Sequence, residues 1–180
     1  WTATLAETHG VEMINFASYP SSQLKNEHLA TIDSIAAVIL SEVRAIYSGK
    51  IAVIWVNETP ELEIYGKGDY LSMGTHAQQL QYEGLTNLKD PSVSELLQPL
   101  RNRIGKLKAA STKYGKEVVL NALDVASYDG MVGTTLQEAE RHKEYTPEDP
   151  NYPLDLQEQA DATEAVRQVI AENSWIIGSY

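Results

Sequence analysis

The sequence predicts a parallel α/β fold, and three observations favour it. Short apolar runs alternate with amphipathic helical patterns in the order β-α-β-β-α-β-α-β. The run 118–120 (VVL) has no polar alternation, which is typical of a strand buried on both faces. Polar residues follow this run directly, and α/β proteins place their sites at the carboxyl ends of parallel strands. If the chain has a functional site, we expect this strand end to line it.

The strands are predicted from short apolar segments that end at Gly, Pro or polar turn residues. They fall at residues 11–18, 50–57, 69–76, 116–125 and 175–180. We expect sequential neighbours in one sheet that curves like part of a barrel. The alternative is a complete flavodoxin-like sheet, in which the strand order would be scrambled.

The helices are predicted from apolar residues at three- and four-residue spacing and from their caps. Residues 1–9 have the pattern of the last turns of a helix that stops at Gly10, and a second helix covers 30–47. A third begins after Ser92, which forms a capping box with Glu95. A fourth begins at Asp155 and Glu158. The expected buried residues are Ile32, Ile35, Ala36, Ile39, Val43 and Ile46 in the second helix, Leu96, Leu97, Leu100, Ile104 and Leu107 in the third, and Ala160, Val166, Val169 and Ile170 in the last.

The composition limits the classes of function. The 180 residues fit one domain, predicted as 1–180, and 43% hydrophobic residues suffice for a core. A formal net charge of -11 disfavours nucleic acid and anionic membranes as partners. The absence of cysteine excludes disulfides and thiolate sites. No apolar run is long enough for membrane insertion, and no signal peptide is visible. The proline-containing acidic segment 127–153 is predicted as a mobile loop.

Four segments together resemble a known group of enzymes. They are SEVRAIYSGKIAV, GDYLSMGTH, PSVSELLQPLRNRIGKLKAASTKYGKEVVL and LDLQEQADATEAVRQVIAENSWIIGSY. In order and spacing they resemble glycoside hydrolases with a TIM (β/α)8 barrel, in particular family 113 and related glycosidase-like barrels. The resemblance implies a partial barrel, strands four to eight, so we expect residues outside 1–180 to complete the fold.

The resemblance also implies two catalytic carboxylates, and this sequence departs from that pattern. A retaining glycosidase needs an acid/base and a nucleophile whose carboxyl groups are about 5–5.5 Å apart. The family places them at the ends of strands four and seven. The matching positions here are Tyr19 and Ala122. Because neither residue is a carboxylic acid, the resemblance does not carry ordinary two-glutamate catalysis to this chain.

Other residues near the predicted strand ends are candidates for a site. Asp124 shares a face with Ala122 by strand alternation and could act as a displaced carboxylate, with Glu58 as a displaced acid. A solvated or capping role remains open for both. Aromatic and polar groups could bind a sugar, although Trp55 could equally be core and His76 a lining group. These candidates are Tyr19, Trp55, Asn57, His76, Asn121 and Tyr128. The histidines lack ligand spacing, so we expect no metal and no cofactor.

Two classes of function follow from these observations. The first is a carbohydrate- or polysaccharide-binding barrel that is inactive or uses displaced residues. The second is a structural or assembly scaffold within a larger extracellular protein, because the chain keeps helices, caps and strands but lacks the glutamates. An extracellular or cell-surface location is expected in both cases. We also expect the remainder of the barrel, from the same or another chain, to be a partner of this chain.

Overall fold

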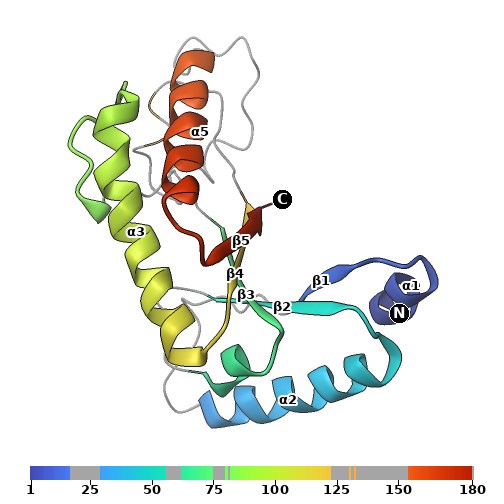
Figure 1. Cartoon of the computed structure of the whole chain (residues 1–180). Helices are drawn as coiled ribbons and strands as arrows, with labels where there is room; N and C mark the ends of the chain where they lie inside the picture. The colour runs from blue at the N-terminus through green and yellow to red at the C-terminus, as the bar shows by residue number, and fades with distance from the viewer. Residues whose placement is uncertain are drawn as a thin grey trace. The chain divides into compact units, whose positions relative to one another are not determined.

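The computed structural model describes residues 1–16, 29–55, 62–74, 80, 82–122, 130, 132 and 154–179. It contains one five-stranded sheet with the strand order β1-β2-β3-β4-β5 (Figure 1). The strands are β1 Met13–Phe16, β2 Lys50–Ile54, β3 Tyr70–Gly74, β4 Val118–Ala122 and β5 Ile176–Ser179. Between them lie α1 Thr2–Thr8, α2 Leu29–Ile46, the 3-10 helix η3 Glu63–Gly66, α3 Val93–Tyr114 and α5 Leu156–Ala171.

The chain forms two compact units. The first contains Trp1–Met73 and Ala109–Val119, and the second contains Gly74–Lys108 and Leu120–Tyr180. The prediction of a single domain over 1–180 stays a prediction.

The sequential strand order confirms the predicted neighbours and makes the flavodoxin-like alternative wrong. β1 pairs with β2 in parallel, with Ile14 opposite Ile51, and β2 pairs with β3, with Val53 opposite Leu71. Each strand begins within two residues of its predicted start. β2 ends at Ile54, earlier than predicted, and residues 56 and 57 lie outside the described part of the chain.

The strands are buried as the unbroken apolar runs predict. Val118, Val119 and Leu120 are all buried although neighbouring side chains on a strand point to opposite faces. In β2 and β3 successive residues alternate between the two faces of the sheet. One carries residues such as Val53 and Leu71, and the other carries the small side chains of Ala52 and Ser72, all of them buried. Cover on both faces is the expected condition of a parallel sheet.

The caps fix the helix boundaries. Gly10 and Gly115 follow α1 and α3 with φ values of 62° and 63°, the left-handed region in which glycine ends helices without strain. At the start of α3, Glu95 accepts hydrogen bonds from the backbone N–H (2.9 Å) and Oγ (2.7 Å) of Ser92. At the start of α5, Asp155 Oδ1 accepts from the N–H groups of Gln157 and Glu158. The predicted caps are therefore confirmed.

The buried faces of two helices differ from the prediction. In α2 the buried residues are Ala36 and Leu40, whereas Ile35, Ile39 and Ile46 are exposed. In α5 Ala160 is exposed and Ile170 is half-buried, and the face is buried instead through Ala162, Ala165, Val166 and Val169. Helical spacing predicted that apolar stripes exist, but it could not show which flank of each stripe meets the sheet. α3 follows the prediction, except that Leu97 is half-buried.

Candidate functional site

The carboxyl ends of the strands are the expected place for a site. β1 ends at Phe16, β2 at Ile54, β3 at Gly74 and β4 at Ala122. Ala122, which the resemblance places at the nucleophile position, is thus the last residue of its strand. A methyl group at that point cannot attack an anomeric carbon.

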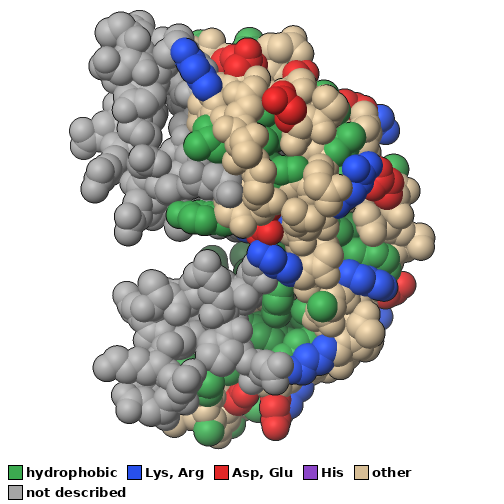
Figure 2. All heavy atoms as spheres, turned by 90° about the vertical axis from the view of Figure 1, so that its left-hand side faces the viewer, with side chains coloured by type: hydrophobic (Ala, Val, Ile, Leu, Met, Phe, Trp, Pro, Cys, Tyr) green, Lys and Arg blue, Asp and Glu red, His purple; other side chains and the backbone are tan. Residues whose placement is uncertain are grey.

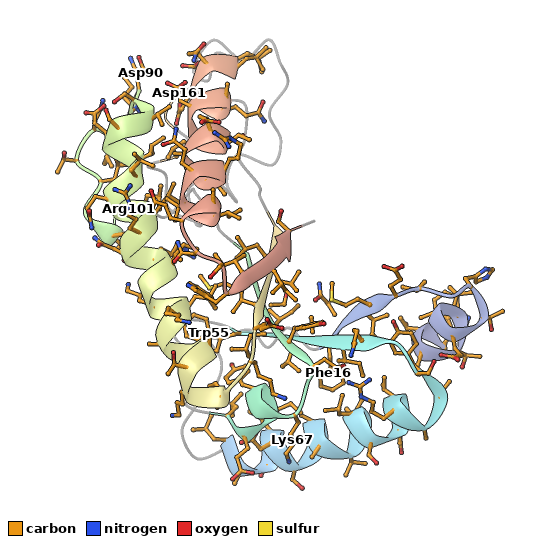
Figure 3. The ribbon with its side chains drawn as sticks, viewed as in Figure 1. Phe16, Trp55, Lys67, Asp90, Arg101 and Asp161 are labelled. Atoms are coloured by element: carbon orange, nitrogen blue, oxygen red, sulfur yellow. The ribbon has the colours of Figure 1, made fainter. Side chains whose placement is uncertain are left out.

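Trp55 is the candidate whose side chain the structure describes. It follows β2 directly and is half-buried (Figure 3). Its backbone N–H donates to the carbonyl of Ser72 at 2.7 Å, which holds the residue in the line of the sheet. A half-buried indole at a strand end keeps part of its ring exposed, and its role in binding a sugar stays a prediction.

One further candidate lies in a described strand. Asn121 lies in β4, but its side chain is not described. Six more lie outside the described residues: Tyr19, Asn57, Glu58, His76, Asp124 and Tyr128. Their convergence on one site, and the loop 127–153 apart from residues 130 and 132, stay predictions.

One buried carboxylate in the second unit was missed by the sequence interpretation. Glu158 is 1% exposed, although it occupies the first turn of α5, where acidic residues are usually solvated. Its Oε2 accepts from the Gly130 N–H at 2.7 Å and its Oε1 from the Val132 N–H at 2.8 Å. Glu158 therefore ties α5 to residues 130 and 132, and Gly130 is two positions beyond the candidate Tyr128 in the sequence. The signal available in the sequence was only a glutamate three residues after a capping aspartate.

The charged cluster in the first unit lies at the other end of the strands. Asp69 precedes β3 and binds Arg44, the Ile51 N–H (2.8 Å) and, more distantly, Lys50 (4.0 Å). Burial by itself would raise the pKa of the Asp69 carboxyl. The hydrogen bonds from Arg44 and Ile51 outweigh that effect and hold the pKa below its ordinary value. Charge at the amino ends of barrel strands serves stability rather than chemistry.

Replacing Asp69 by asparagine should lower the free energy of unfolding by about 1–2 kcal/mol at pH 7, because the pair is only partly shielded from solvent. The folded pKa is depressed, so the ionised carboxylate stabilises the fold above the unfolded pKa of about 3.9. That stability is lost as pH falls through the folded pKa. Urea titrations from pH 7 to pH 3 should therefore show the difference between Asp69→Asn and the native chain shrinking below about pH 4. Glu63→Gln, at an exposed position, is the control, and an equal difference at both pH values would contradict the assignment.

Metal ligands, membrane-spanning helices and surface charge were considered among the described residues. No group of three or more His, Asp or Glu side chains among the described residues is arranged to hold a metal ion. Within the same residues, no helix is both long and apolar enough to cross a membrane. On the face drawn in Figure 2, Lys and Arg side chains are interspersed with Asp and Glu.

Comparison with solved structures identifies the fold. A structure of a GH113 beta-1,4-mannanase superposes with a TM-score of 0.61 at 17% identity, and a complex structure of a GH113 beta-1,4-mannanase superposes with 0.59 at 18%. The GH113 beta-mannanase AaManA from Alicyclobacillus acidocaldarius, in complex with ManMIm, superposes with 0.65 at 15%. This chain has the fold of part of a GH113 mannanase. No family model and no curated protein matches the sequence.

The extent of the superposition shows how much of the mannanase fold this chain matches. Each comparison covers 99% of this chain but 47% of the mannanase chain, so this sequence spans about half the length of those structures. The resemblance to strands four to eight of a (β/α)8 barrel is consistent with this coverage. At identities of 15–18% the likeness establishes the fold alone.

Proposed function

We propose that this chain is the carbohydrate-binding part of a glycoside-hydrolase-like barrel that lacks standard two-glutamate catalysis. The observation that carries the proposal is the GH113 fold over 99% of the chain, combined with a tyrosine and an alanine at the two positions matched to catalytic glutamates. The fold supports a sugar-binding edge, and the missing carboxylates argue against hydrolysis.

The binding surface is proposed to be the carboxyl ends of the strands. Trp55 supplies a ring for stacking on a sugar, and Tyr19, Asn57, His76, Asn121 and Tyr128 supply further aromatic and hydrogen-bonding groups. Completion of the barrel by further sequence in the same or another chain would enclose this edge. Since polysaccharides are met outside the cell, an extracellular or cell-surface location belongs to the same proposal.

Soluble mannan is the probe that tests the proposal. The native chain should be retarded in a mannan-containing affinity gel and should release no reducing sugar. Trp55→Ala should weaken binding by roughly 3–10-fold, because an aromatic contact contributes about 0.5–1.5 kcal/mol.

Trp175→Ala is the matched control. Trp175 precedes β5, at the amino end of that strand, so its loss should leave retardation unchanged. No retardation by mannan or by other polysaccharides would favour the scaffold function instead. Hydrolysis at an ordinary glycosidase rate would contradict the proposed lack of catalysis, and Asp124 and Glu58 would then be mutated first.

A further inference from the structure

One buried hydroxyl group in β3 has no hydrogen-bond partner among the described residues. The side chain of Ser72 is 0% exposed, and its Oγ makes no hydrogen bond within the described part of the chain. Buried polar groups in folded proteins are almost always hydrogen-bonded, because a hydroxyl that leaves water without gaining a new partner lowers stability. The Ser72 hydroxyl therefore destabilises the free chain.

The strands on either side of Ser72 explain why the sheet supplies no partner. β2 places Ile54 opposite it in the parallel register. On the β4 side, the Leu71 N–H donates to the Glu117 carbonyl at 3.0 Å. This hydrogen bond sets the register in which Val119 is the neighbour of Ser72 on the same face. Both neighbouring side chains are apolar, so neither can pair with the hydroxyl.

Packing alone does not require a serine on this face of the sheet. Ala52 lies on the same face of β2 and is also 0% exposed, so the face accommodates a buried side chain that has no hydroxyl. A second buried serine shows the usual arrangement, because the Oγ of Ser111 donates to the Lys116 carbonyl at 2.6 Å. A buried polar group that breaks this rule is expected where function, and not the stability of the free fold, determines the residue.

Ser72 lies beside the proposed carbohydrate-binding edge. Its backbone carbonyl accepts from the N–H of Trp55 at 2.7 Å. β3 ends two residues later, at Gly74, so Ser72 is one pleat from the carboxyl edge of the sheet. Gly74 is the next residue on the same face, and glycine has no side chain. β3 itself therefore adds no side chain between the hydroxyl and that edge.

We propose that Ser72 is a specificity-determining residue for carbohydrate, and that a hydroxyl group of a bound sugar supplies the missing hydrogen bond, directly or through one bridging water. This role rests on the proposed function and adds to it a residue that was not among the sequence candidates. A neutral hydroxyl suits Ser72, because its Oγ can both donate and accept and its neighbours Ile54 and Val119 carry no charge. A site that hydrogen-bonds a hydroxyl discriminates against ligands that lack it.

Ser72→Ala should change stability and affinity in opposite directions. In the free chain, removal of the unpartnered hydroxyl should raise Tm by roughly 2–4 °C. Retention by soluble mannan in an affinity gel should weaken by roughly 3–10-fold, because one hydrogen bond to the ligand is lost. Ser111→Ala is the matched control, since it removes a buried hydroxyl that has a partner. Its Tm should fall, and its affinity for mannan should equal that of the native chain.

Ser72→Cys distinguishes the hydrogen bond from the shape of the side chain. A thiol has a similar shape but is a weak donor and acceptor, so affinity should fall as it does in Ser72→Ala. Native affinity in either variant would overturn the proposal. So would a Tm decrease in Ser72→Ala as large as in Ser111→Ala, because the hydroxyl would then have a partner in the free chain. A native chain that mannan does not retard would overturn the proposed function and the role of Ser72 together, whereas a retarded native chain with an equally retarded Ser72→Ala would overturn only the latter.

Discussion

Glu158→Ala is expected to lower the free energy of unfolding by about 3–5 kcal/mol. The side chain accepts two backbone hydrogen bonds, at 2.7 and 2.8 Å, and is almost fully buried. A hydrogen bond to a charged group contributes roughly 1.5–3 kcal/mol, and truncation leaves the N–H donors of Gly130 and Val132 without this acceptor. Because a domain is stable by only about 5–15 kcal/mol, a Tm decrease on the order of 10 °C should follow.

Two further variants distinguish the contribution of the buried Glu158 carboxylate from the effect of changing any acidic residue in α5. Glu158→Gln keeps one acceptor oxygen but turns an amide NH2 toward the other backbone N–H, so its effect should be intermediate. Glu164→Gln changes an exposed carboxylate on the same helix, where Arg167 and Gln168 hold its pKa down to about 2, and should change Tm little. Amide exchange at Val132 should accelerate in Glu158→Ala. Equal Tm values for Glu158→Ala and Glu164→Gln would show that the two hydrogen bonds contribute nothing to stability.

The two hydrogen bonds of Glu158 also connect the stability of the fold to the proposed function. Gly130 lies two residues after Tyr128 and six after Asp124, both candidates for the site. Glu158 binds the backbone of Gly130 from α5, which is distant in sequence. We therefore expect its loss to weaken carbohydrate binding through position rather than contact.

Local signals in the sequence were sufficient for most of the fold. The runs around Val53 and Val119 predicted buried strands because cover on both faces leaves no polar alternation. Asp155 and Ser92 predicted helix starts because capping satisfies N–H groups within one turn. Each signal operates over a few residues, so it does not depend on the tertiary arrangement.

The features that the sequence did not predict depend on what packs against each residue. Ile35, Ile39 and Ile46 belong to an apolar stripe that the spacing predicted as buried, but all three are exposed. Glu158 resembles an ordinary first-turn acid, and its burial comes from residues almost 30 positions earlier. The strand pattern predicted where the carboxyl edge of the sheet lies, and Trp55 follows β2 at that edge, but the binding site itself stays a prediction. The roles of the remaining candidates rest on the resemblance and not on a signal within a few residues of the sequence.

Gly68→Ala should destabilise the first unit by about 3 kcal/mol, at the upper end of the usual overpacking range. A Cβ at this position would lie 2.7 Å from Val53 Cγ2, 3.0 Å from the carbonyl oxygen of Ile51 and 3.2 Å from that of Tyr70. The valine methyl can rotate away, but the two carbonyls belong to strands β2 and β3. Relief would therefore require the paired backbones to move apart, which weakens their hydrogen bonds.

Gly105→Ala is the matched control and should change stability in the opposite direction. Gly105 lies within α3, and a Cβ there would meet nothing within 4 Å. The substitution should stabilise by roughly 0.5–1 kcal/mol, because alanine loses less backbone entropy in a helix. Adding Val53→Ala to Gly68→Ala should recover only part of the loss, since the carbonyl contacts remain and the valine leaves a cavity. Full recovery in urea unfolding would show that the valine alone restricts this turn, whereas no loss for Gly68→Ala would contradict the close approach of the two strands.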